Sequence, residues 1–393
     1  MGDEFGGVGV EVECVVGSFC KKEDDEEDWP HALVLTCPAQ GHINPMLQFS
    51  KRLHSKGTKV TFLLPSPPSK PPLRLHPSSI HVVHISDGSE VADQDEELSL
   101  EDNLERLRVG LTRSLEEFLD SPAYLERPAK VLIYDSFVPY VLDVALRHRL
   151  HGAPFFTQSA AVCSIYYLAH AGNFRIPPVA GAGLPVVGDH PELSMLGPGD
   201  LPSFMSDGNP YPELAKLAIG QLSNFREARW MLFNTFVELE EEVVNWMVSE
   251  WPLLAIGPTV PSMYLDKRLK DDKDYGASLF EPEVEDYMKW LDSKETGSVA
   301  YVSFGSFASL GEEQMEEIGA RIGRNGRGIF TADEITKCID EIMFDDRGRE
   351  IRQRSTKWKE LAQMALREGG SSDRNIDKFV KELVECTPNS KLS

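Results

Sequence analysis

The sequence has no uninterrupted apolar run near the roughly 20 residues that a membrane-spanning helix requires, so we expect no stable membrane insertion. It also has no excess of basic residues: 40 lysines and arginines stand against 63 aspartates and glutamates, a formal net charge of −23. Nucleic acid requires a basic footprint, and anionic membrane surfaces attract basic segments. We therefore expect neither as a partner.

Other signals are also missing. The first residues show no basic start followed by an apolar stretch, so we expect no secretory signal. The six cysteines are scattered, without the close-spaced pairs typical of metal sites. These absences indicate reduced thiols, no metal site and a cytoplasmic location. We also expect a monomer. The 393 residues correspond to two or three domains.

Residues 1–29 are predicted to be a disordered leader, because they are rich in glycine and end in an acidic run that repels itself. A first domain is then predicted over residues 30–255. It opens with a buried strand at 32–37, a helix at 44–56 that ends at Gly57, and a strand at 60–64. This β-α-β unit predicts a parallel sheet with right-handed crossovers.

The alternation of strands and helices continues through the first domain, which indicates a doubly wound, Rossmann-like α/β fold. Further strands are predicted at 80–85, 131–134 and 154–157, and further helices at 104–119, 141–145 and 164–170.

The second domain, predicted over residues 256–393, is short of strands. It offers one parallel strand at 299–304, a turn at 305–308 and a helix opening at 312–320. A glycine-rich stretch at 321–328 follows, and then only helices, around 335–342, 358–365 and 371–383. Because a lone strand cannot form a sheet, this domain is predicted to be a truncated Rossmann-like unit.

Two residues are candidates for a catalytic site. His42 follows the first strand and Asp135 ends the strand at 131–134, so both lie at the edge where open α/β sheets bind ligands. A histidine there can act as a general base, and a nearby carboxylate would orient it. The alternatives are a surface-loop histidine and a helix N-cap aspartate. Spacing alone favours the surface-loop interpretation of His42, whereas Asp135 can both cap a helix and orient a histidine.

Several segments resemble the plant family-one UDP-glycosyltransferases, in order along nearly all of residues 31–320 and 328–385. Within this family, the segments are most similar to the branch that glucosylates small carboxylic acids and phenolics in secondary metabolism. The matching segments are 38–47 (PAQGHINPML), 134–145 (YDSFVPYVLDVA), 155–162 (FFTQSAAV), 201–204, 234–240, 256–259, 290–292 and 302–306.

The resemblance implies a GT-B fold, with the acceptor in the first domain and the co-substrate UDP-glucose in the second. It implies an inverting transfer without metal or cofactor, in which His42 deprotonates the acceptor and Asp135 orients His42. The remaining implied contacts are Gly41, Thr157, Gly305 and Ser306 for the donor, and Gln40 and Gln158 for the acceptor.

The sequence departs from the family between residues 320 and 328. The donor signature, with its stacking tryptophan and its His-Cys-Gly-Trp-Asn-Ser run, is missing, and the histidines stop at His190. An internal deletion, by exon skipping or a gene-model error, explains this, and a genuine short paralogue is the alternative. We therefore expect impaired transfer, or a non-catalytic remnant that binds acceptor-like ligands. A nicotinamide oxidoreductase is disfavoured, because the first turn lacks G-x-G-x-x-G and Leu64-Pro65 ends the second strand.

Overall fold

The computed structural model describes residues 29–67, 80–89, 98–173, 200–205, 211–270, 272–273, 275, 284–296, 298–299, 301, 303, 322–324, 330–387 and 389. The predicted leader therefore lies outside the described residues, apart from Trp29. So do the predicted turn at 305–308 and the helix at 312–320.

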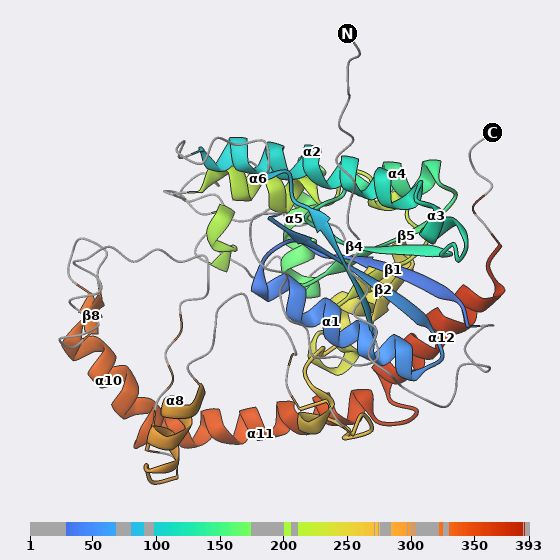
Figure 1. Cartoon of the computed structure of the whole chain (residues 1–393). Helices are drawn as coiled ribbons and strands as arrows, with labels where there is room; N and C mark the ends of the chain where they lie inside the picture. The colour runs from blue at the N-terminus through green and yellow to red at the C-terminus, as the bar shows by residue number, and fades with distance from the viewer. Residues whose placement is uncertain are drawn as a thin grey trace.

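A seven-stranded parallel sheet forms the centre of the molecule, in the order β3-β2-β1-β4-β5-β6-β7 (Figure 1). The predicted parallel Rossmann-like sheet is thus confirmed for the first domain. Its strands are β1 (His31–Leu35), β2 (Lys59–Ser66), β3 (His81–Ser86), β4 (Val131–Asp135), β5 (His151–Phe156), β6 (Met231–Phe233) and β7 (Leu253–Ala255).

Helices cover both faces of this sheet, because successive side chains of a strand point to opposite faces. Ala32 and Val34 of β1 face one core, whereas Leu33 and Leu35 face another. The covering helices are α1 (Gln40–Ser55), α2 (Leu100–Leu119), α3 (Pro122–Leu125), α4 (Val141–Arg147), α5 (Ala160–His170), α6 (Pro212–Gly220) and α7 (Glu241–Glu250), with the 3-10 turns η4 (Ser203–Met205), η5 (Phe225–Glu227), η6 (Val237–Leu239) and η7 (Ser262–Tyr264).

Helix α1 begins earlier than the sequence indicates. Its first residue is Gln40, preceded by an extended Ala39, so Pro45 lies inside the helix and His42 lies in its first turn. The predicted end is confirmed: Gly57 has φ +82°, a left-handed conformation that glycine adopts without strain.

The second domain differs from its prediction. The structure describes Val299, Tyr301 and Ser303 of the predicted strand at 299–304, and these three residues form no strand. Tyr301 is 90% exposed. The other residues of the predicted strand lie outside the described residues.

Among the described residues beyond 257, the strands are a short antiparallel pair, β8 (Ile322–Arg324) and β9 (Phe330–Thr331), in a stretch for which no strand is predicted. A truncated Rossmann-like sheet is therefore not seen in that part of the chain. The described helices there are α8 (Val284–Asp292), α10 (Ala332–Met343), α11 (Asp346–Leu366) and α12 (Ser371–Glu385).

Helix α12 packs against the sheet of the first domain, although the sequence assigns it to residues 256–393. Its buried side chains Ile376, Phe379 and Leu383 belong to the same core as α1. The ring of Phe379 lies 5.0 Å from that of Trp230, whose Nε1 donates to Glu382 at 2.6 Å. The chain therefore returns to complete the layer that α1 begins (Figure 1).

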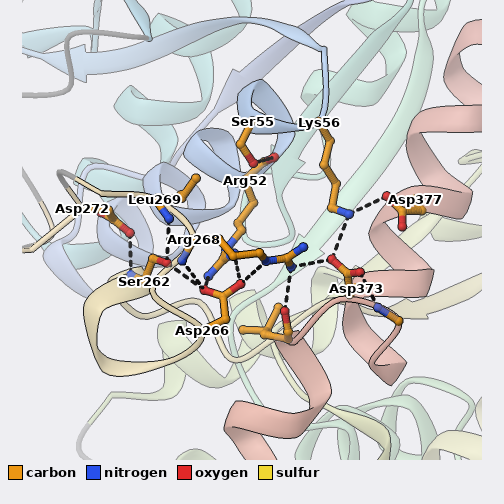
Figure 2. A network of polar contacts seen from close by, with 12 residues as sticks. Arg52, Ser55, Lys56, Ser262, Asp266, Arg268, Leu269, Asp272, Asp373 and Asp377 are labelled. Carbon is orange, nitrogen blue, oxygen red and sulfur yellow. Dashed lines mark hydrogen bonds and ion pairs between the residues drawn. The ribbon is translucent and has the colours of Figure 1, made fainter.

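A buried ion pair joins α1 to the loop after η7 (Figure 2). Arg52 donates two hydrogen bonds of 2.6 Å to the carboxylate of Asp266, whose side chain is 2% exposed. Ser262 Oγ and Arg268 Nε also donate to this carboxylate, at 2.7 and 2.5 Å. Burial raises the pKa of Asp266, but these donors outweigh burial and hold the pKa well below its ordinary value.

We predict that Asp266→Asn lowers the free energy of unfolding by about 3–5 kcal/mol at neutral pH, because it leaves Arg52 buried without its partner charge. A carboxylate with a depressed pKa stabilises the fold above its unfolded pKa and loses that contribution as the pH falls. Urea unfolding should thus show a difference from wild type that is largest above about pH 4 and shrinks in acid.

The control is Asp377→Asn, which removes an ion pair between Lys56 and a side chain that is 59% exposed. It should cost about 1 kcal/mol or less. Equal losses for the two variants would contradict the importance of the buried pair.

Candidate active site

The strand order reverses between β1 and β4. From β1 the chain winds outward through β2 to β3, and β4 then starts the winding on the other side. Ligands of open α/β sheets bind beyond the carboxyl ends of the strands at such a reversal. Leu35 and Asp135 end the two strands there.

The structure brings His42 and Asp135 together at this edge. His42 Nδ1 lies 2.7 Å from Asp135 Oδ2, so the predicted proximity is confirmed. The His42 side chain is 13% exposed and that of Asp135 is fully buried. The interpretation of His42 as a surface-loop histidine is therefore wrong. Asp135 is not the N-cap of α4, a position that Tyr140 occupies.

Backbone donors complete the environment of Asp135. The N–H of Phe137 donates to Oδ1 at 2.9 Å, and the N–H of Cys37 donates to Oδ2 at 3.3 Å. The ring of Phe137 lies 5.0 Å from the ring of His42. The turn after each strand therefore holds the carboxylate in place.

Electrostatics favour protonation of His42. Burial lowers its pKa, but the charge of Asp135 and the hydrogen bond to it outweigh burial and leave the pKa above its ordinary value. A carboxylate partner requires the proton on Nδ1. Among the described residues, no hydrogen bond reaches Nε2, which is therefore the nitrogen that can accept a proton from a ligand.

The other site residues proposed from the sequence are placed as follows. Thr157 and Gln158 follow β5 at the same edge, and Gln158 Nε2 donates to Gln221 Oε1 at 2.8 Å. Gln40 Nε2 donates to Asn44 Oδ1 at 2.6 Å. Gly41 is exposed, with open space where a Cβ would stand. Gly305 and Ser306 lie outside the described residues.

Two supporting residues were not anticipated. Gln221 is buried and also accepts from Ser136 Oγ at 2.7 Å, linking the turn after β4 to Gln158. Glu240 accepts from the N–H groups of Ala160 and Ala161 at 2.9 Å, and so fixes the start of α5. Sequence alone gives no signal for Gln221, because its partners Gln158 and Ser136 are 63 and 85 residues distant.

Within the described ranges, no group of three or more histidine, cysteine or carboxylate side chains could hold a metal ion. No described helix is both long and apolar enough to cross a membrane.

Comparison with known proteins gives consistent matches, although no family model matches the chain. The chain is 34% identical to UDP-glycosyltransferase 74E2 of Arabidopsis thaliana, over 89% of this chain and 98% of that relative. It is 33% identical to a mogroside I-E synthase of Siraitia grosvenorii, over 90% and 98%. Among solved structures, Os79 from O. sativa in complex with UDP aligns with a TM-score of 0.78 and 26% identity, over 90% of this chain and all of that one.

We predict that Asp135→Asn lowers the pKa of His42 from above to below its ordinary value of about 6.5, because burial remains and the opposing charge is lost. Nitrogen chemical shifts of the imidazole, followed against pH by NMR, measure this directly. His84 of β3, whose pKa is lowered by burial and does not depend on Asp135, provides an internal reference that should not move. An unchanged His42 midpoint would contradict the coupling.

Proposed function

This chain belongs to the plant family-one UDP-glycosyltransferases, and on that premise we propose that its first domain binds a small phenolic or carboxylate acceptor and activates it for inverting transfer of glucose from UDP-glucose. The observation that carries the proposal is the buried His42–Asp135 pair at the edge of the sheet. The family transfers hexoses from UDP-sugars. The choice of glucose and the acceptor class are part of the proposal, as are a cytoplasmic location and a monomeric state.

In the proposed mechanism His42 Nε2 accepts the proton of the acceptor hydroxyl. Asp135 holds the ring by its 2.7 Å bond and balances the imidazolium that forms. The acceptor oxygen then attacks the anomeric carbon, UDP leaves, and the configuration inverts. Thr157, Gly41, Gly305 and Ser306 are the proposed donor contacts. Gln40 and Gln158 are the proposed acceptor contacts.

We further propose that transfer is impaired, because the chain lacks an internal segment of the donor half. The alignment with the Arabidopsis relative spans 446 positions, whereas the whole chain has 393 residues, so at least 53 positions of that relative face a gap. The chain has no histidine after His190. Both observations support an internal deletion, which we propose lies between residues 320 and 328.

The contrast between the first domain and the rest of the chain also supports a second function. The sheet and the His42–Asp135 pair are whole, while the described part of the chain beyond residue 257 contains no parallel sheet. A protein in this state would bind acceptor-like ligands without catalysing transfer. The family assignment leaves a nicotinamide oxidoreductase without support.

We predict that the chain binds UDP orders of magnitude more weakly than an intact relative. Several buried polar anchors are missing at once, and each contributes about 1–3 kcal/mol. Titration calorimetry with UDP tests this. The control is a chain that carries the missing segment of the Arabidopsis relative between Ala320 and Gly328, which should regain UDP binding and transfer. Tight binding by the unmodified chain would refute the proposed impairment.

We predict that His42→Ala, made in that restored chain, lowers the rate with a phenol by about 10²–10⁴-fold, because a phenol is protonated at neutral pH and needs a base. The loss should be smaller with a carboxylic acid, which is already ionised. His170→Ala, at the exposed end of α5, is the control and should leave both rates unchanged. Equal losses for the two acceptors would mean that His42 mainly supports structure.

A further inference from the structure

The chain crosses twice between the sheet and the C-terminal helices α10 and α11. The first crossing leaves the sheet through η7 and the residues that follow it, up to Lys270. The second is the turn Arg367–Gly370, which joins α11 to α12 (Figure 1). The orientation of α11 therefore depends on how these two crossings are held.

The second crossing has a narrowly defined shape. Gly369 has φ +74°, and a Cβ on Gly370 would lie 2.2 Å from the carbonyl oxygen of Met364. Gly370 N–H donates to the carbonyl of Arg367 at 2.8 Å. Two glycines thus permit a tight turn here, and Asp373 of α12 accepts a hydrogen bond from the N–H of Gly369 at 2.9 Å.

Arg268, on the first crossing, contacts both sides of the second. Its NH2 group donates to the carbonyl of Leu366, the last residue of α11, at 2.7 Å, and to Asp373 Oδ1 in the first turn of α12 at 2.6 Å. Its Nε donates to Asp266, which is paired with Arg52 of α1 (Figure 2). One guanidinium therefore joins both crossings to the helix that begins beside His42.

These three contacts require arginine. The guanidinium is planar and presents several N–H groups in fixed directions, so it can bond to two carboxylates and a carbonyl at once. A lysine ammonium at the same place would retain its charge but could not reproduce this geometry.

We propose that Arg268 is a positioning residue, which fixes the direction of α11 relative to the sheet edge that carries His42 and Asp135. The proposed effect of Arg268 on the direction of α11 can be measured whether or not the chain catalyses transfer. Its consequence for transfer rests on the proposed function, because the distance between donor half and base would depend on the same direction.

Lys56 provides a matched comparison. Its ammonium contacts Asp373 at 2.8 Å and also Asp377, both in α12. It therefore joins the end of α1 to α12, and within the described residues its ion pairs are to these two aspartates of α12. Lys56→Met should cost stability without changing the direction of α11.

The test is a distance distribution in the full chain, measured by electron spin resonance between labels on unnatural amino acids at Val109 of α2 and Ser355 of α11, both exposed positions. Wild type and Lys56→Met should give one narrow distribution. Arg268→Met should broaden it by about twofold, as expected when a hinge is released. Arg268→Lys should also broaden it, and it carries the test if the methionine variant fails to fold by circular dichroism.

A distribution for Arg268→Lys that superimposes on wild type would overturn the proposal, as would equal broadening in Lys56→Met. Kinetics of the restored chain give a second readout: Arg268→Lys should lower kcat while leaving KM for the acceptor unchanged. If the restored chain shows no transfer at all, the proposed function fails, and the distance measurement still decides the role of Arg268.

Discussion

The reversal of strand order between β1 and β4 is the constraint on which the site depends. Parallel neighbours in register bring Leu35 opposite Tyr134, so the turns after both strands open at one edge. The turn after β1 becomes the first turn of α1 and carries His42, and β4 ends in the buried Asp135. A carboxylate buried without partners would be costly. Two backbone N–H groups and the imidazole Nδ1 satisfy it here, and within the described part of the chain no hydrogen bond occupies Nε2.

The core of the first domain is completed by a helix near the C-terminal end of the sequence. Helix α12 covers the face of the sheet beside α1, and its Phe379 packs between Phe49 and Trp230. Ser372 and Asn375 donate to the carbonyls of Gly257 and Ala255 at the end of β7. The first domain is thus complete, although the described residues beyond 257 contain no parallel sheet. This explains how the chain retains a whole sheet and an intact histidine–aspartate pair.

Much of the first domain could be predicted from the local pattern of apolar and polar residues. Buried apolar runs identify β1, β2 and β4, and a histidine and an aspartate placed directly after such runs must meet at one edge of a parallel sheet. The docking of α12 and the pairing of Arg52 with Asp266 could not be predicted, because the paired residues are 214 positions apart and no local periodicity links them. Of the strand predicted at 299–304, the described residues Val299, Tyr301 and Ser303 form no strand, and an apolar run alone does not supply the neighbouring strands that a sheet requires.

The central claim is that one chain retains an acceptor site and has lost its donor site. A single NMR titration of the full chain tests it, with a simple phenol added first and UDP second. The account predicts that phenol shifts the signals of His42 and of residues at the carboxyl ends of β1 and β4, and that UDP at micromolar concentration then shifts none of the assigned signals. Saturable shifts with UDP at micromolar concentration, or an unchanged His42 signal with phenol, would contradict it.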